Sequence, residues 1–303
     1  MDQLAALLDG PRARGAFLLR SILDPPWSLR IQDEAPLSVI AMVRGEAWVV
    51  LDDGDPLPLE PGQVAVVRGP EPYTVADDPA TKPQIIVHPG QHCTTLDGES
   101  LYEAMDLGVR TWGNNRDGST VLLTGTYSVE GEVSRRLLEA LPRLIEQPGG
   151  SVVALLVAEI AKDEPGQEAV LDRLLDLLLI AVLRSYFATH EAPGWYRALG
   201  DPVVGKAMRM LHNNPAHPWT VAALATQVGV SRASLARRFT ELVGEPPMAF
   251  LTGWRLALAA DLLREPGATI GSVARKVGYG SPFALSAAFK RVRGVSPQEH
   301  RAG

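Results

Sequence analysis

The feature that most constrains this chain is a repeat near its C-terminal end, in which one pattern of apolar residues and glycines occurs twice. The first copy begins at Trp219 and reads WTVAALATQVGVSRASLARRFTELVG, and the second begins at Thr269 and reads TIGSVARKVGYGSPFALSAAFKRVRGVSP. Six pairs of residues match at an offset of 49 or 50 positions: Ala225 and Ala274, Val228 and Val277, Gly229 and Gly278, Leu235 and Leu285, Phe239 and Phe289, Leu242 and Val292. Each copy has helical spacing on both sides of a glycine. The repeat therefore predicts two helix–turn–helix modules, a motif that reads DNA.

Turn and capping residues stand where each module needs them. Thr220 and Ser231 are placed to cap the two helices of the first module, and Gly229 between them can adopt the positive φ of a tight turn. Thr269 and Ser281 occupy the same capping positions in the second module. These residues predict where all four helices begin.

Helical geometry separates a buried face from an outward face in the second helix of the first module. At about 100° per residue, Leu235, Phe239 and Leu242 form the buried stripe, and Leu285, Phe289 and Val292 form its counterpart in the second copy. Arg237 lies opposite the stripe, and arginine most often pairs with guanine in the major groove. Arg232 and Arg238 lie on the flanks, where phosphate contacts are expected.

The outward face of the second copy has few hydrogen-bonding side chains, so we expect the second module to position the chain more than it specifies sequence. Phe283 is placed to touch a thymine methyl or, alternatively, to pack against the segment between the modules. Lys290 is placed to contact a phosphate or a guanine. The predicted DNA-binding residues are Ser231, Arg232, Ala233, Ala236, Arg237, Arg238, Thr240, Ser281, Phe283, Ser286, Ala287, Lys290 and Arg291.

The segment between the two modules, residues 247–265, predicts one continuous helix. A helix of about 18 residues is about 27 Å long. Neighbouring major grooves on one side of B-DNA lie about 34 Å apart. A rigid helix of this length can therefore hold two recognition helices near successive grooves of one duplex.

Charge is distributed unevenly along the chain. The whole chain has a net charge of −6, but residues 201–303 contain 13 Lys and Arg against 6 Asp and Glu. Residues 1–200 contain 16 basic and 29 acidic residues. A basic C-terminal third on an acidic body fits a nucleic-acid footprint, although chance clustering on solvated helices gives the same count.

The N-terminal part is typical of a small antiparallel β-barrel or double-sheet roll. After residues 1–20, whose spacing favours a short helix, six short runs rich in branched and aromatic residues alternate with Gly and Pro turns. The runs are SLRIQ, PLSVIAMV, EAWVVL, QVAVV, YTVA and PQIIVH. Residues 43–75 resemble the cupin fold in their order of hairpin, Pro-Gly turn and strand. That family implies a metal site built from histidines, but no histidine precedes His88, and Tyr73 stands where such a loop often ends in histidine.

The spacing becomes helical after residue 131. Residues 133–145, 151–162 and 168–190 predict three helices, separated by Gly and Pro at 148–150 and 165–166. The third has a wide apolar stripe that either packs onto the roll or forms a dimer contact. Its residues are Leu171, Leu174, Leu175, Leu178, Val182 and Leu183. The domain boundary is expected within residues 190–202.

One cluster in the N-terminal part carries candidate sensor chemistry. His88, His92 and Cys93 form HPGQHC, a spacing that could ligate zinc or copper. The same cluster could make Cys93 sensitive to oxidants, or it could be a surface loop with no ligand. A small-molecule effector pocket lined by Trp27, Trp48, Tyr73 and Trp112 is a further possibility, against ordinary core packing.

Residues 202–301 closely resemble the AraC/XylS family of bacterial transcriptional regulators. The resemblance rests on the paired modules, the linking segment and the closing GVSPQEHR. The cupin-like roll resembles the sensor domain of one branch of that family. The family often has phenylalanine and arginine where this chain has Leu285 and Ala287, which weakens the case for base reading by the second module. The resemblance implies double-stranded DNA as a partner, and we also expect a homodimer and contact with RNA polymerase.

The predicted architecture is an α+β multidomain chain. It has a cupin-like sensor or dimerisation roll over 1–130, a helical dimerisation or linker region over 131–200, and an all-α double helix–turn–helix domain over 201–303. A DNA-binding transcription regulator is the leading function. A cupin-type enzyme and a constitutive DNA binder, whose N-terminal domain only dimerises, are the alternatives. No Ser-His-Asp, phosphate-loop or HExxH pattern supports catalysis. We predict no cofactor beyond a metal ion or small-molecule effector.

Three features bear on the compartment. The single cysteine excludes an intramolecular disulfide framework. The first residues, MDQLAALLDGPRARG, lack the layout of a signal peptide. The most apolar run, residues 174–183, contains Asp176 and is too short to span a bilayer. We therefore expect a cytoplasmic protein without a membrane partner. The effector, the operator sequence and the choice between activator and repressor stay open at this point.

Overall fold

The computed structural model describes residues 17–127, 138–139, 141–190 and 192–302. Residues 17–127 and 141–190 belong to one compact unit and residues 192–302 to a second. In the part of the chain that the structure describes, no helix is long and apolar enough to cross a membrane.

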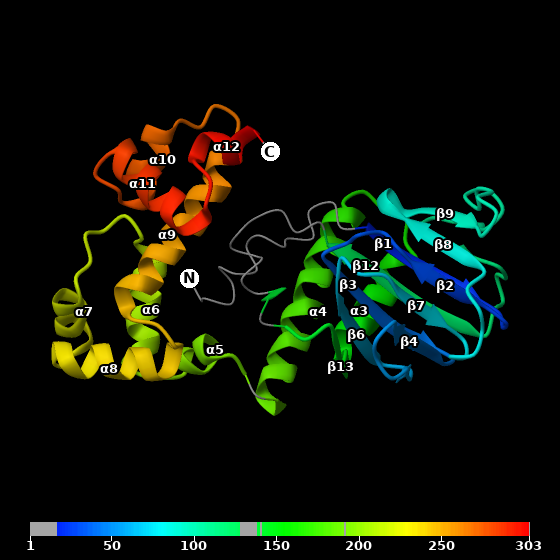
Figure 1. The fold of residues 1–303 in the computed structure, drawn as a ribbon. Helices are drawn as coiled ribbons and strands as arrows, with labels where there is room; N and C mark the ends of the chain where they lie inside the picture. The colour runs from blue at the N-terminus through cyan, green and yellow to red at the C-terminus, as the bar shows by residue number, and fades with distance from the viewer. Residues whose placement is uncertain (1–16, 128–137, 140, 191, 303) are drawn as a thin grey trace. The chain divides into compact units, whose positions relative to one another are not determined.

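Two sheets form the first unit, as the turn-rich N-terminal sequence predicts (Figure 1). Among the described residues, one sheet has the order β10 (Asp106–Gly108), β11 (Thr111–Gly113), β1 (Phe17–Leu23), β12 (Thr120–Tyr127), β3 (Leu37–Arg44), β6 (Gln63–Arg68) and β13 (Leu144–Pro148). The other has the order β5 (Leu57–Leu59), β4 (Ala47–Leu51), β7 (Tyr73–Ala76), β2 (Ser28–Ile31), β8 (Ile85–His88) and β9 (His92–Thr95). The described pairs are antiparallel except β1 with β11 and β2 with β8.

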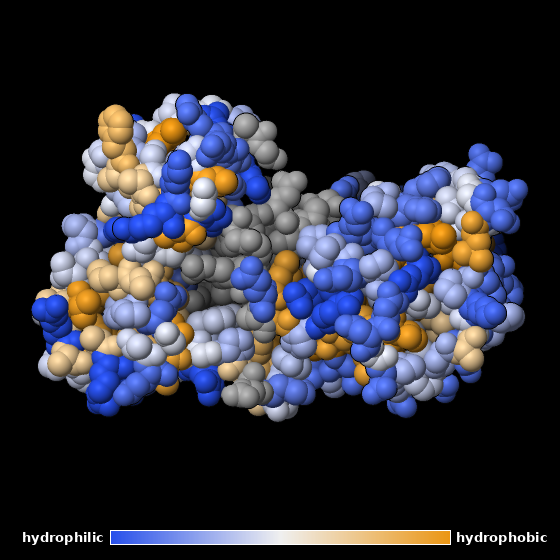
Figure 2. Space-filling model, viewed as in Figure 1, coloured by the Kyte–Doolittle hydropathy of each residue, from blue (hydrophilic) through white to orange (hydrophobic). Residues whose placement is uncertain are grey.

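The space between the two sheets holds the core of this unit. Successive side chains of a strand point to opposite faces, so alternate residues of each strand enter the core. Trp27, Ile40, Met42, Val49 and Leu122 are all buried there. On the face shown in Figure 2, the surface over the roll is mostly hydrophilic, with scattered hydrophobic patches.

Strand β1 corrects the expectation of a short helix over residues 1–20. Phe17–Arg20 belong to a strand that pairs with β12 on one side and β11 on the other. Residues 1–16 lie outside the described residues. β12 pairs with the whole of β1, and β11 pairs with Arg20, Ser21 and Ile22 on the other side. This tertiary gain overrides a local helical spacing.

Helices α3 (Gly150–Ile160) and α4 (Gln167–Thr189) begin after the predicted Gly and Pro breaks. The apolar stripe of α4 packs against the roll, which is the first of the two alternatives that its sequence allows. Gly125 in β12 lies so close to α4 that an added Cβ would come within 2.7 Å of Leu175 Cδ1. The buried Tyr127 hydroxyl donates to the Leu175 carbonyl at 2.8 Å. The helix is therefore seated directly on the sheet.

Strand β13 corrects the C-terminal end of the helix predicted over residues 133–145, of which the described residues 138–139 are helical. Leu144 and Ile145 pair with Val67 and Val66 at the edge of β6. Pro142 cannot continue a helix, and the free edge of β6 offers the segment backbone partners. Residues 133–137 and 140 lie outside the described residues.

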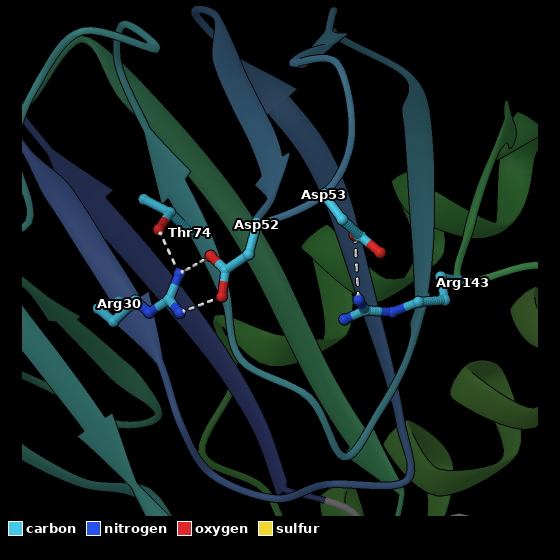
Figure 3. Close-up of polar contacts among 5 residues, drawn as sticks. All are labelled: Arg30, Asp52, Asp53, Thr74 and Arg143. Carbon is cyan, nitrogen blue, oxygen red and sulfur yellow. Dashed lines mark hydrogen bonds and ion pairs between the residues drawn. The ribbon is translucent and has the colours of Figure 1, made fainter.

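Two neighbouring carboxylates after β4 join the turn there to both sheets (Figure 3). Arg30 on β2 donates to both oxygens of Asp52 at 2.6 Å, and to Thr74 on β7 at 3.3 Å. Arg143, just before β13, donates to Asp53 at 3.2 Å. The hydrogen bond from Arg30 lowers the pKa of Asp52. Both carboxylates are largely exposed, so the pairs fix the turn more than they stabilise the fold.

The second unit contains helices on both sides of one long helix, α9 (Pro247–Arg264), as Figure 1 shows. Its other described helices are α5 (Gly194–Leu199), α6 (Val204–Asn213), α7 (Val221–Val228), α8 (Arg232–Val243), α10 (Ile270–Val277), α11 (Pro282–Arg293) and α12 (Pro297–Ala302). The predicted linking helix over 247–265 is confirmed, with 18 residues. Each helix pair has its own apolar core, one centred on Phe239 and one on Phe289.

Candidate nucleic-acid interface

The first module, α7 and α8, is built as the sequence predicts. The Thr220 hydroxyl accepts from the Ala223 amide, and the Ser231 hydroxyl accepts from the Ser234 amide. Gly229 between the helices has φ 76°, a conformation that strongly favours glycine. These caps fix both ends of the turn and so the direction in which α8 leaves it.

The outward face of α8 presents Arg237. Leu235 and Phe239 are fully buried, and the side chain of Arg237 between them is 72% exposed. Its guanidinium lies 3.2 Å from Glu241, one helical turn further along. An exposed pair of this kind contributes only about 0.3–0.5 kcal/mol, so the arginine can exchange it for another acceptor at little cost.

Arg238, which the sequence places on a flank of the outward face, is hydrogen-bonded within the chain. It donates from Nε and Nη2 to Asp201 at 3.0 and 2.5 Å. Asp201 also accepts from the amides of Val203 and Val204. Burial works against ionisation of Asp201, but the amide hydrogen bonds and Arg238 outweigh it and lower its pKa. Arg238 therefore ties α8 to the start of α6 and is drawn away from a phosphate.

The second module, α10 and α11, has the same frame. Thr269 and Ser272 form a reciprocal capping box, and the Ser281 hydroxyl accepts from the Ala284 amide. Gly278 has φ 83° in the turn. Leu285 and Phe289 are fully buried, like their counterparts in the first module.

Val292 is the exception to the shared skeleton. The repeat predicts an inward position for it, but it is 56% exposed. Its counterpart Leu242 is partly buried against the first core. The reason is α5: Gly194, where it begins, lies so close to α8 that an added Cβ would come within 2.5 Å of the Leu242 carbonyl oxygen. The described neighbours of α11 leave Val292 exposed.

Phe283 stands out on the second recognition helix. It is 85% exposed at the first turn of α11, so it does not pack against the linking helix. Lys290, two turns further along, is also exposed. At the position that matches Arg237 this module has Ala287, so the outward face of α11 offers the bare ring of Phe283 and the cation of Lys290 but no counterpart to that arginine.

The remaining predicted interface residues fall into three groups. Those with exposed side chains are Arg232, Ala233, Thr240, Ala287 and Arg291. Ala236 and Ser286 are partly buried. Ser231 and Ser281 hold helix caps, and the Thr240 hydroxyl donates to the Ala236 carbonyl at 2.9 Å, so these three hydroxyls are engaged within the chain.

The structure does not bring His88, His92 and Cys93 together as three ligands. In the β8–β9 pair His88 lies opposite His92, while Cys93 lies opposite Val87 on the other face. His88 Nε2 is hydrogen-bonded to Thr94 Oγ1 at 3.0 Å. Among the described residues, no group of three or more His, Cys, Asp and Glu side chains is arranged to hold a metal ion. Strand alternation, which a loop reading of HPGQHC ignores, accounts for the separation.

Burial also alters the chemistry of Cys93. It raises the pKa of the thiol to about 11. Since the thiolate is the form that oxidants attack, little of the reactive form exists near neutral pH. Cys93 packs against the core instead.

A cavity of about 640 Å³ opens between the two sheets. Leu29, Ile31, Val87 and Trp112 give it apolar walls, and Tyr73 also lines it. Of the four aromatic residues predicted to line a pocket, Tyr73 and Trp112 do so, whereas Trp27 is buried in the core and Trp48 is not among the lining residues.

The cavity also has polar groups that the sequence did not single out. Ser21 is only 4% exposed and lines the cavity. Arg110 lines it with a strained backbone at φ 45°. Asp33 accepts from Gln91 at 2.9 Å beside it. The sequence carried one signal that Ser21 faces inward: Leu19, Ser21 and Leu23 stand at alternate positions, as residues on one face of a strand do. The expectation of a helix over residues 1–20 hid this signal.

Comparison with known proteins covers the whole chain. Residues 2–188 match the Cupin family and residues 224–303 match the Helix-turn-helix domain family. A putative AraC-like transcription regulator of Streptomyces lividans is 33% identical over 99% of this chain and 98% of its own length. One of Streptomyces antibioticus is 32% identical with the same coverage. The HTH-type transcriptional regulator AlkR of Acinetobacter baylyi is 28% identical over 99% of both chains. These relatives are transcription regulators, which sets the enzyme alternative aside.

Proposed function

The chain belongs to the AraC-type DNA-binding transcription regulators with an N-terminal cupin domain, and on that premise we propose that α8 and α11 occupy successive major grooves of one duplex. In this proposal Arg237 is the principal base-reading residue. Phe283 and Lys290 give the second helix an apolar contact and a cationic contact. The predicted contacts of Arg232 and Arg291 go to phosphates.

The observation that carries the proposal is the position of Arg237. Two fully buried residues and a capped N-terminus hold α8 in place, and the arginine points away from them. A bidentate contact with guanine discriminates by about 1–3 kcal/mol, whereas the competing pair with Glu241 contributes about 0.3–0.5 kcal/mol. Exchange of Glu241 for a guanine edge is therefore favourable.

The test is a selection of bound duplexes from random DNA with the full chain, repeated with Arg237→Ala. We expect the variant to lose about 1–3 kcal/mol at one base pair and to accept other bases there. Glu241→Ala, which frees the arginine without removing it, is the matched control and should keep the wild-type preference. An equal loss on every sequence would mean that Arg237 contacts only phosphate.

For the N-terminal domain we propose that the cavity between the sheets binds a small-molecule effector with a mainly apolar body. The support is its volume, its apolar walls and the buried polar residue Ser21 in its lining. Fluorescence of the probe 1-anilinonaphthalene-8-sulfonate should rise on binding, and Leu19→Trp, which fills part of the cavity, should abolish that rise. An unchanged rise in the filled variant would place the probe elsewhere.

We propose further that two copies pair through the side of the helices turned away from the roll. Val170 and Leu177, seven residues apart on one face of α4, are both exposed, as is Leu155 on α3. Sedimentation velocity should give a dimer for the wild type and a monomer for Leu177→Glu. A wild-type monomer at micromolar concentration would contradict this pairing.

A further inference from the structure

The segment between α6 and α7, residues 214–218, is held by residues from outside its own module. We call it the junction loop. It begins where the Asn214 amide donates to the Met210 carbonyl at the end of α6, and it leads to the cap of α7. The Trp219 indole donates back to the Asn214 carbonyl at 2.9 Å. The loop thus has a defined shape against which other elements can pack.

Arg255, on the linking helix α9, binds this loop through its backbone. Its Nε donates to the Pro215 carbonyl at 2.6 Å and its Nη2 to the His217 carbonyl at 2.8 Å. Burial lowers the pKa of Arg255, and an unpaired buried charge would be costly. The two carbonyl contacts offset that cost, and the planar guanidinium fixes both at once.

Gly278, in the turn of the second module, touches the same loop from another side. A Cβ added there would lie 2.6 Å from Ala216 Cα and 2.8 Å from Ala216 O. Both are backbone atoms, so no side-chain rotation can relieve the overlap. Gly229, the matching glycine of the first module, has nearly the same positive φ but nothing within 4 Å of an added Cβ. Close approach to the loop is thus particular to Gly278.

The two modules have separate cores. α9 contributes Phe250 and Leu251 to the first, and Leu256, Ala259 and Leu263 to the second. Among the described residues, none belongs to both cores. A single shared helix leaves the modules room to twist about it, and the junction loop is a second point of attachment.

We infer that Arg255 and Gly278 lock the junction loop between the two modules and so set the spacing of the two DNA submotifs that the chain accepts. Arg255 is a positioning residue in this inference, since it touches no base. The inference rests on the proposed binding of α8 and α11 in successive grooves. When two binding elements are joined, the second binds at an effective concentration set by the geometry of the joint. A rigid joint favours DNA sites with one spacing between the submotifs and weakens binding to sites with a slightly shorter or longer spacing.

The experiment measures affinity of the full chain for its selected site and for sites with one base pair inserted or removed between the submotifs. We expect the affinity of the wild type to be roughly 10-fold or more lower for the altered sites, a change within the range that the geometry of a joint can produce. Arg255→Met, which keeps the apolar stem, and Gly278→Ala should reduce that penalty to about 2-fold or less on the same reasoning. Arg255→Lys keeps the charge but cannot span both carbonyls. Its spacing penalty should therefore lie between that of the wild type and that of Arg255→Met.

Two variants serve as matched controls. Arg264→Met removes an exposed arginine from the same helix, and Gly229→Ala introduces the same positive-φ strain without the overlap. Both should keep the wild-type spacing penalty, whatever they do to overall affinity. Variants of Arg255 and Gly278 that bind more weakly yet keep the full spacing penalty would overturn the inference.

A measurement without DNA separates this inference from the proposed function. In the free protein, the amides of His217 and Trp219 donate to carbonyls of the junction loop, those of Asn214 and His217. Hydrogen exchange at these amides should accelerate in Arg255→Met and Gly278→Ala but not in the two controls. Unchanged exchange would refute the lock even if DNA binding is confirmed, and faster exchange in a chain that binds no specific DNA would refute only the proposed function.

Discussion

The two helix–turn–helix modules share their interior and differ in almost everything that faces outward. Phe239 and Phe289 are both fully buried at matching positions, and both turns contain a glycine with positive φ. On the outside, the first module presents an arginine where the second presents alanine and, one turn before it, a bare phenylalanine. Packing therefore constrains the duplicated positions alike, apart from Leu242 and Val292, while the surfaces in contact with solvent are free to take different roles.

The modules also differ in what surrounds them. The first is covered at its end by α5 and tied by Arg238 to Asp201, whereas Val292 in the last turn of α11 is exposed. Lys290, Arg291 and Arg293 occupy that last turn. Cations near a helix C-terminus are favourable to the helix dipole, and they also suit a phosphate backbone. These differences support the proposal that the first module reads bases and the second anchors the chain to the DNA backbone.

The most disruptive way to test the shared interior is to replace each buried phenylalanine. Phe239→Ala and Phe289→Ala should each cost about 3–5 kcal/mol of unfolding free energy, because both leave a large cavity in a small core. Urea unfolding followed by the helical circular dichroism signal gives the values. A cost below about 1 kcal/mol for either one would show that the two interiors are not equivalent.

The N-terminal helix caps of the two modules should contribute less to stability than the buried phenylalanines, and by different amounts. Thr269→Ala should destabilise by about 1–2 kcal/mol, and Thr220→Ala by less, at about 1 kcal/mol, since only at the Thr269 cap does the cap residue's own amide also donate to a side chain, the Ser272 hydroxyl. Amide exchange in the first turns of α7 and α10 reports each loss separately. Ser272→Ala, which removes one half of the box, should bring the second cap to the level of the first.

The difference between the outward faces of the two modules can be tested at Phe283. If its ring contacts a thymine methyl, replacing that thymine by uracil should weaken wild-type binding by about 1 kcal/mol and leave Phe283→Ala unaffected. Fluorescence anisotropy on the paired duplexes measures the coupling. Arg237→Ala is the control, because it should respond to uracil as the wild type does. A uracil effect that persists in Phe283→Ala would rule out this contact.

The smallest predicted effect concerns the helices that follow each module. α12 begins with a box in which the Ser296 amide donates to Glu299 and the Glu299 amide donates to the Ser296 hydroxyl. These hydrogen bonds lower the pKa of Glu299. Their contribution is therefore present above the unfolded pKa of about 4.3 and is lost as pH falls through the folded value. α9, which follows the first module, begins with prolines and no such cap.

Carboxyl carbon chemical shifts followed against pH would measure the pKa of Glu299. Glu299 should titrate below the unfolded value, and Ser296→Ala should return its midpoint toward that value. An unshifted midpoint in the wild type would remove the box as a difference between the modules.

Local features of the second unit could be predicted from the sequence, because caps, turns and apolar stripes depend on near neighbours. Thr220, Ser231, Thr269 and Ser281 are all confirmed as caps. The contact of Arg238 with Asp201 joins residues 37 positions apart, and no local pattern marks it. Arg255 did leave a signal, as a charge inside the apolar run of α9, since such a charge needs a partner.

The first unit was harder to predict because its elements depend on pairing between distant strands. β1 and β13 are strands because β12 and β6 offer them edges, not because of their own spacing. The cavity is invisible in a sequence for the same reason: its walls come from strands of both sheets. The face on which Cys93 lies follows from its register with Val87, and register is a property of the pair.

The separation of the two cores also makes the DNA-binding unit a practical object for engineering. Substitutions in residues that share no neighbours have additive effects on stability, so the exposed positions of α8 and α11 can be randomised in independent libraries. Each library would be screened against one half of an operator, and the best members would then be combined in one chain. Recognition of a new promoter would thus be assembled by halves, without redesigning the helices that carry it.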